Sequence, residues 1–149
     1  MSRELIFDIE TIGDIRDYSQ LKITVVSIFD YATDSYVSFD ETNLLGLWPY
    51  IEKADRLIGY NSDHFDIPIL NRYYPGELTA FPSLDMLKVV KDVLGKRYKL
   101  NDLAKATLQI EKSADGLQAQ EWYKQGKIDE IKKYCEQDVK VTKEVYEYG

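Results

Sequence analysis

Two acidic residues stand two positions apart at the end of the first apolar run, Asp8 and Glu10 in the segment ELIFDIET. The apolar run predicts a strand, and side chains two positions apart on a strand point to the same face of the sheet. Two neighbouring carboxylates repel each other unless a proton or a cation lies between them. Because Mg²⁺ prefers carboxylate oxygens and water, the pair is a candidate site for a divalent cation. Solvated acids at an exposed strand end are the alternative for an isolated pair of this kind.

A second group of polar residues follows a later predicted strand, in the segment GYNSDHFDIPIL over residues 59–70. Asn61 closes the strand, and Asp66 enters the first turn of the next helix, just before Pro68. An acid at that position could instead complement the helix dipole. We expect His64 to be an exposed loop residue rather than a metal ligand, because the chain has no second histidine to pair with it.

The third group lies on the last predicted helix, in the segment YCEQDV. Tyr134 and Asp138 are four positions apart, so the phenol and the carboxylate share one helix face. Cys135 is interpreted as a small buried apolar residue rather than a nucleophile, since no basic partner lies near it in the sequence. Each group alone is weak evidence for a functional site. The three groups together, in this order along the chain, are a more specific signal.

Composition limits the classes of protein that remain. The chain has 149 residues, 44% apolar and 30% charged, which predicts one folded domain over residues 1–149. One cysteine and one histidine exclude an internal disulfide and zinc sites rich in either residue. No apolar run is long enough to span a membrane, and no leader segment is recognisable, so we expect a cytoplasmic protein whose metals, if any, are held by oxygen.

The net charge of −7 argues against a simple basic protein that coats DNA. Bases nevertheless gather locally, at Lys88, Lys91, Lys96, Arg97 and Lys99. This basic cluster is either a contact surface for phosphate or a solvated helix face.

The apolar pattern predicts an α/β domain in which a mixed sheet, with antiparallel hairpin strands and parallel strands, is flanked by helices. Strands are expected at 4–9, 21–31, 34–39 and 56–61. Helices are expected at 44–51 with a start or kink at Pro49, at 65–74, at 99–108, at 118–125 and at 127–147. Residues 81–95 are expected to combine a short extended stretch with a helix that Gly95 stops.

Taken in order, the three groups resemble the three motifs of the DEDD (DnaQ-like) 3′–5′ exonucleases, a family with a ribonuclease-H-like fold. FDIET matches the first motif, GYN-x3-FD-x-P-x-L the second, and YCEQDV the third in its tyrosine (DEDDy) form. Lys133 occupies the position where the histidine subtype has its histidine. The likeness is greatest to stand-alone predicted exonucleases of bacteria and phages and to the proofreading domain of family B DNA polymerases. Residues 11–22 are shorter than in many relatives.

The resemblance implies a metal-dependent 3′–5′ exonuclease that hydrolyses phosphodiester bonds from the 3′ end of single-stranded nucleic acid, with DNA favoured over RNA. Two divalent cations, Mg²⁺ or Mn²⁺, would serve as cofactors. By resemblance, Asp8, Glu10 and Asp138 hold the first cation. Asp8 also bridges to the second cation, which Asp66 reaches through water. Tyr134 orients the attacking water, since its ordinary pKa near 10 makes it a poor general base.

Substrate contacts are also implied by the resemblance, at Asn61, Phe65, Ile9 and Thr11. For Asn61 a loop-fixing amide is the alternative, and for Phe65 a core aromatic.

Other functions remain open at this point. The same fold could be a catalytically idle module that binds nucleic acid or a protein partner, although such a module usually lacks one of the acids. An internally cutting nuclease of the ribonuclease H kind would lack the Tyr134–Asp138 helix arrangement. A regulatory domain that binds cations only loosely would show no activity. The oligomeric state and the biological pathway are not indicated by the sequence.

Overall fold

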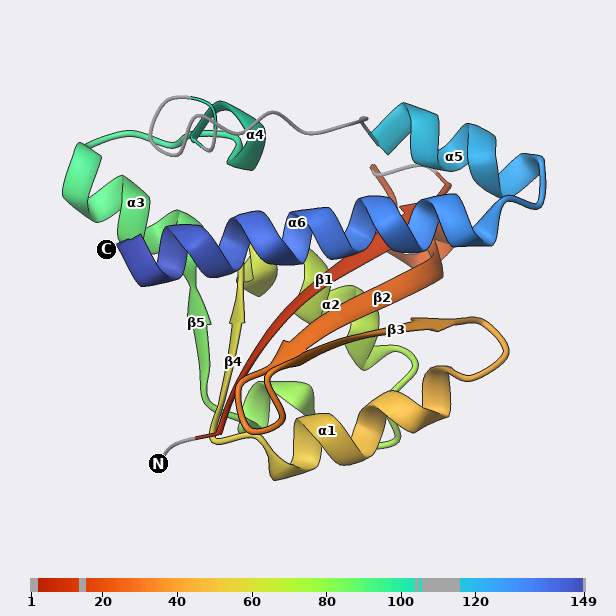
Figure 1. Cartoon of the computed structure of the whole chain (residues 1–149), viewed down its shortest axis with the longest axis horizontal. Helices are drawn as coiled ribbons and strands as arrows, with labels where there is room; N and C mark the ends of the chain where they lie inside the picture. The colour runs from red at the N-terminus through yellow and green to blue at the C-terminus, as the bar shows by residue number, and fades with distance from the viewer. Residues whose placement is uncertain (1–2, 14–15, 104, 106–115, 149) are drawn as a thin grey trace.

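The computed structural model describes residues 3–13, 16–103, 105 and 116–148. Its centre is a five-stranded sheet in the order β3-β2-β1-β4-β5 (Figure 1). The strands are β1 (Glu4–Ile12), β2 (Lys22–Asp30), β3 (Ser35–Asp40), β4 (Arg56–Gly59) and β5 (Ser83–Asp85). Strands β1, β2 and β3 are antiparallel, whereas β1, β4 and β5 are parallel. The expected mixed α/β sheet is confirmed.

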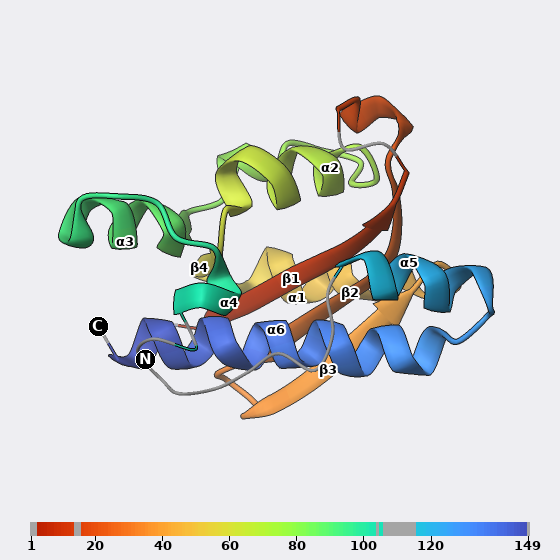
Figure 2. The ribbon, with the colours of Figure 1, turned by 90° about the horizontal axis from the view of Figure 1, so that it is seen from above.

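Helices cover both faces of this sheet. The long helix α6 (Ile128–Tyr148) runs along one face, and α1 (Trp48–Lys53) and α2 (Ile67–Asn71) lie on the other (Figures 1 and 2). Helix α5 (Gly116–Lys124) packs against α6 and β1, and α3 (Met86–Leu94) also contacts α6. A short helix, α4 (Leu100–Leu103), follows α3. Among the described residues, no helix is both long and apolar enough to cross a membrane.

The central strand β1 divides its side chains between the two faces. Leu5, Phe7 and Ile9 are buried in the core on the α1 and α2 side. Ile6 is buried in the second core, which includes Met86 from α3 and the α6 valines. Asp8 and Glu10 have the same alternation as Ile6, so their carboxylates are directed toward the α6 side.

Several expected boundaries are confirmed because local signals set them. Gly95 ends α3 with a left-handed φ of 81°, and Gly126, with φ 74°, separates α5 from α6. Pro49 lies in the first turn of α1, so the expected helix begins there, after a 3₁₀ turn η2 (Leu44–Leu47). Pro68 likewise lies in the first turn of α2.

Several expected elements differ from the structure. Strand β4 ends at Gly59, two residues before Asn61, which was expected to close it and instead has a left-handed φ. Strand β1 continues to Ile12, three residues past its predicted end, because β2 pairs with it along that length. The helix predicted over 65–74 is replaced by a single π-helical turn, η3 (Ser62–Asp66), followed by the short α2. The helix predicted over 99–108 is observed as α4, and residues 104 and 106–108 of that prediction lie outside the described residues.

Gly59 lies so close to neighbouring side chains that no Cβ atom fits there. A Cβ atom there would lie 2.6 Å from Cβ of Ser62 and 3.1 Å from Cε1 of Phe7. We therefore expect Gly59→Ala to cost about 2 kcal/mol of unfolding free energy through overpacking, and to lower the melting temperature by about 4–8 °C. Thermal unfolding followed by circular dichroism measures this effect.

The matched control is Gly76→Ala, where the added carbon meets only the Tyr74 ring, at 3.0 Å, in an exposed segment. If Gly59→Ala had the same melting temperature as the wild type, the turn after β4 would accommodate the added carbon without loss of stability, which would contradict the prediction.

Candidate metal centre

Three elements bring the predicted acids to one region. Strands β1 and β4 are parallel neighbours, so their carboxyl ends lie at the same edge of the sheet. Asp8 and Glu10 lie in the second half of β1, and Asp66 ends the π-helical turn that follows β4. Helix α6, which packs against β1, supplies Tyr134 and Asp138. Single π-helical turns of this kind occur frequently at functional sites.

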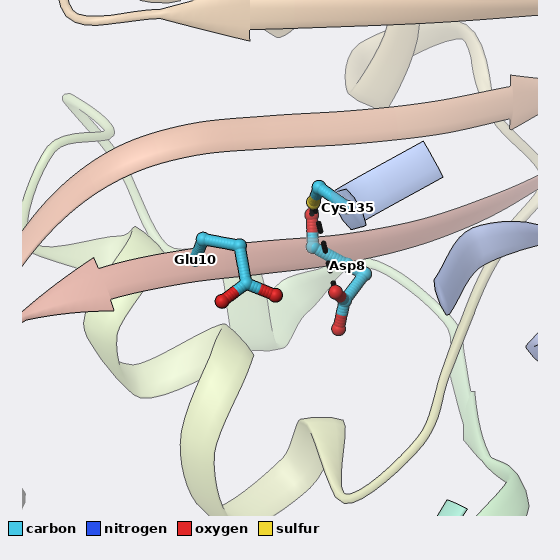
Figure 3. A group of neighbouring side chains, drawn as sticks. All are labelled: Asp8, Glu10 and Cys135. Atoms are coloured by element: carbon cyan, nitrogen blue, oxygen red, sulfur yellow. Dashed lines mark hydrogen bonds between the residues drawn. The ribbon is translucent and has the colours of Figure 1, made fainter. Parts of the chain in front are cut away.

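Asp8 and Glu10 direct their carboxylates to the same side of β1, as the sequence predicted (Figure 3). One oxygen from each, together with Sγ of Cys135 from α6, forms a group of potential ligand atoms all within 4.8 Å of one another. The thiol also donates to the backbone carbonyl of Asp8 at 3.3 Å and to its Oδ2 at 3.6 Å. Cys135 is fully buried, as expected.

The Cys135 thiol stays protonated in this environment. Burial raises its pKa well above the ordinary value, and the negative charges of Asp8, Glu10 and Asp138 raise it further. A protonated thiol is a weak donor and a poor ligand for Mg²⁺ or Mn²⁺, which prefer oxygen. Of these three carboxylates, Asp8 and Glu10 lie within 4.8 Å of the sulfur.

A β-bulge lies beside Glu10. The pairing between β1 and β2 shifts between Glu10 and Thr11, which leaves Thr24 of β2 as the extra residue. The Thr24 hydroxyl donates to the Glu10 carbonyl at 3.2 Å. Bulges bend a strand and redirect its side chains, and they are frequent next to active sites. The bulge is therefore part of what orients the Glu10 carboxylate.

Asp66 is the most perturbed acid of the group. It is only 4% exposed, and burial raises the pKa of Asp66 to about 8. A hydrogen bond from the backbone N–H of Ile9 opposes this shift, whereas the charges of Asp85 and Asp138 add to it. Because Ile9 stands between Asp8 and Glu10, that bond fixes Asp66 against the strand that carries the acid pair.

Tyr134 and Asp138 lie on the buried side of α6. Asp138 is 5% exposed, and its charge acts on both Asp66 and Cys135. The Tyr134 ring packs edge-on against Trp122 of α5, with 6.3 Å between ring centroids. The structure thus brings Asp8 and Glu10 together, and the charge of the buried Asp138 acts on Asp66. The contact with Trp122 of α5 holds the tyrosine ring.

Asp85 is a buried acid that the sequence reasoning missed. Its Oδ1 accepts from the backbone N–H of Asn61 at 2.8 Å and of Leu87 at 3.0 Å, and its Oδ2 accepts from Asp63 N–H at 3.1 Å. It therefore caps α3 and anchors the turn that carries Asp66. An aspartate directly before an apolar helical run is a common N-cap signal, and that signal could have found it.

The expected substrate contacts fall into two groups. The Ile9 side chain is buried in the core, its backbone N–H holds Asp66, and its substrate contact stays a prediction. Phe65 is half-buried against the same core, and Thr11 is half-buried opposite Ile23. Asn61 has a left-handed φ of 59°, and its Oδ1 is buried without a hydrogen bond in the described structure. For Asn61, Phe65 and Thr11, substrate contact stays a prediction.

His64 is exposed on the η3 turn, as expected. The basic cluster is exposed as well, and two of its members contact a neighbouring side chain. Lys88 forms an ion pair with Asp63 of the η3 turn at 2.6 Å, and the Lys96 ammonium lies 5.2 Å from the centroid of the Tyr98 ring.

The donor set fits divalent cations. Asp66 Oδ2 is buried and has no hydrogen-bond partner among the described residues. A buried carboxylate oxygen in that state is costly unless a cation or a proton satisfies it. The Asp8 and Glu10 carboxylates lie close together, and carboxylate oxygens are the ligands that Mg²⁺ and Mn²⁺ prefer, so the region is a candidate site for a divalent cation.

The chain matches a protein-family model described as RNase_H superfamily over residues 5–149. It therefore belongs to the RNase_H superfamily, and this membership supports a nuclease-type function. A comparison with curated proteins finds no match.

Among solved structures, the fold is similar to a family B DNA polymerase from the hyperthermophilic archaeon Pyrobaculum calidifontis. The TM-score is 0.81 at 19% sequence identity, over 99% of this chain. The match covers 24% of the polymerase, so this chain spans about a quarter of that protein's length. At this identity the similarity establishes the fold.

Proposed function

We propose that the protein is a metal-dependent 3′–5′ exonuclease of the DEDDy kind that shortens single-stranded nucleic acid, with DNA preferred over RNA. The observation that carries the proposal is the pair of half-buried carboxylates, Asp8 and Glu10, on one side of β1. Two further buried acids support it, Asp66 from η3, which is bonded to the Ile9 backbone, and Asp138 from α6. Superfamily membership and the fold shared with a family B DNA polymerase support it.

Each acid has a role in holding two divalent cations. Asp8, Glu10 and Asp138 would hold the first, and Asp8, together with Asp66 acting through water, would hold the second. When bound, such cations would supply an activated water and stabilise charge on the leaving 3′ oxygen. The Tyr134 hydroxyl orients the attacking water, and its ring, packed on Trp122, keeps that hydroxyl in place. Asp85 and the Ile9 N–H fix the position of Asp66 before any cation binds.

The partner in this proposal is a nucleic-acid strand with a free 3′ end. Two divalent cations offset the formal charge of four carboxylates, so the site can accept a phosphodiester despite the acidic composition. Lys88, held beside the η3 turn by Asp63, is placed to add a positive charge near the strand.

The direct test is incubation of 5′-labelled single-stranded DNA and RNA of one sequence with Mn²⁺ or Mg²⁺. We expect stepwise shortening that EDTA abolishes, with DNA consumed faster. Asp138→Ala should give no shortening while keeping the wild-type circular dichroism spectrum. Equal lack of cleavage by wild type and variant would favour the alternative of an idle module that binds nucleic acid or protein.

Tyr134→Phe removes the hydroxyl and keeps the ring that packs on Trp122. We expect kcat to fall about 10–100-fold with the melting temperature nearly unchanged, because positioning of the water is lost and packing is not. Single-turnover cleavage at saturating Mn²⁺ measures the change.

Tyr31→Phe is the control, since that hydroxyl bonds to Glu147 at 3.0 Å near the end of α6. A Tyr134→Phe rate equal to that of the control would contradict a role for the hydroxyl.

A further inference from the structure

The Cys135 side chain is the only uncharged group in the three-residue cluster that it forms with Asp8 and Glu10. Its thiol faces two acceptors of the same residue, the Asp8 carbonyl at 3.3 Å and Asp8 Oδ2 at 3.6 Å (Figure 3). The cysteine thus joins the backbone and the carboxylate of Asp8 to one point on α6. A side chain held in this way has fewer rotamers available to it.

Polar side chains of β2 and β3 lie near the Cys135 sulfur. Ser27 is paired with Asp8 across β1 and β2, is fully buried, and lies beside the Cys135 side chain. Ser27 Oγ lies 2.7 Å from Ser38 Oγ of β3, and Ser38 donates to Glu136 Oε1 at 2.8 Å. Because Ser38 donates to Glu136, the hydrogen between the two serines comes from Ser27, and the Cys135 thiol keeps its own proton for Asp8. Apolar packing alone would not require polar neighbours at these buried positions.

We propose that Cys135 is a positioning residue of the metal centre, whose thiol fixes the Asp8 carboxylate in the orientation that receives divalent cations. This inference rests on the proposed function, because it assigns Asp8 as the ligand being positioned. Partners that orient a metal ligand commonly change metal affinity about 10–100-fold when they are removed. For a weak thiol donor we expect the lower end of that range, about tenfold.

The test measures Mn²⁺ binding alone, by the loss of the free-ion electron paramagnetic resonance signal, in Cys135→Ala and Cys135→Ser. We expect Cys135→Ala to bind Mn²⁺ about tenfold more weakly and Cys135→Ser to remain within about threefold of wild type, because serine keeps a donor. At limiting Mn²⁺, Cys135→Ala should lower kcat and leave KM for the oligonucleotide unchanged.

Ile131→Val is the matched control, since Ile131 is fully buried in the same cluster as Cys135 on the same helix. It should bind Mn²⁺ as the wild type does. Wild-type affinity in Cys135→Ala, or equal losses in the alanine and serine variants, would overturn the positioning role and leave the proposed function intact. A wild type that takes up no Mn²⁺ and cleaves nothing would overturn the proposed function, and the positioning role with it.

Discussion

Replacement of Asp8 by asparagine is expected to reduce cleavage about 10³-fold or more while the protein stays folded. Asp8 is the carboxylate that both cations share in the proposed centre, and asparagine has the same shape without the charge. A 10³-fold loss corresponds to roughly 4 kcal/mol of transition-state stabilisation. The measurement is the initial rate on 5′-labelled single-stranded DNA at several Mn²⁺ concentrations, together with the melting temperature.

Asp34→Asn provides a control that removes the same charge elsewhere. Asp34 is exposed in the hairpin turn between β2 and β3, with a positive φ of 52° that asparagine tolerates. It should cleave at the wild-type rate. A folded Asp8→Asn protein that also retains the wild-type rate would remove Asp8 from the centre.

Asp66→Asn is expected to abolish cleavage and, in the absence of metal, to make the protein more stable at pH 8. Burial raises the pKa of Asp66 to about 8, against an ordinary value near 3.9 in the unfolded chain. The folded state therefore binds more protons than the unfolded state between those values, and the contribution of this group to stability is lost as pH rises from about 4 to 8. Asparagine has no charge to bury, so we expect a gain of about 2 kcal/mol, or roughly 4–8 °C.

Melting temperatures from pH 5 to pH 8.5, with EDTA and with Mn²⁺, measure this prediction. With EDTA, the difference between Asp66→Asn and wild type should grow toward pH 8. Added Mn²⁺ should raise the melting temperature of the wild type and have a smaller effect on the variant, because binding to the folded state alone is stabilising. A difference that does not change with pH would show that Asp66 is charged in the metal-free protein.

The fold was predictable where short-range signals determine it. The β2–β3 hairpin follows from β-branched runs around a tight turn, and Gly95 and Gly126 end helices because they adopt positive φ. The π-helical turn at Ser62–Asp66 carries no such signal. Asp85, more than twenty positions away, anchors it by accepting the backbone N–H of Asn61 just before the turn and that of Asp63 within it. The spacing of apolar residues along the sequence does not indicate tertiary hydrogen bonds of this kind.

Sequence spacing predicts which candidate site residues share a face, and it does not predict the contacts that hold them. Asp8 and Glu10 follow from strand alternation, and Tyr134 and Asp138 from helix spacing. The contact of Cys135 with Asp8 was not predicted, because a buried cysteine is more often a small apolar core residue. The spacing of three between Cys135 and Asp138, which places these two residues on one helix face, was the available signal. The support that the Ile9 backbone gives to Asp66 was not predicted, because a backbone hydrogen bond leaves no mark in the residue pattern.

The proposed polarity of cleavage is tested most directly with one single-stranded DNA prepared in two forms, labelled at its 5′ end or at its 3′ end. With Mn²⁺, the account predicts that the 3′ label is released as a mononucleotide from the start, while the 5′-labelled strand shortens one nucleotide at a time. Short internal fragments from both forms would contradict an exonuclease and indicate internal cutting. Release of the 5′ label as a mononucleotide would contradict the direction.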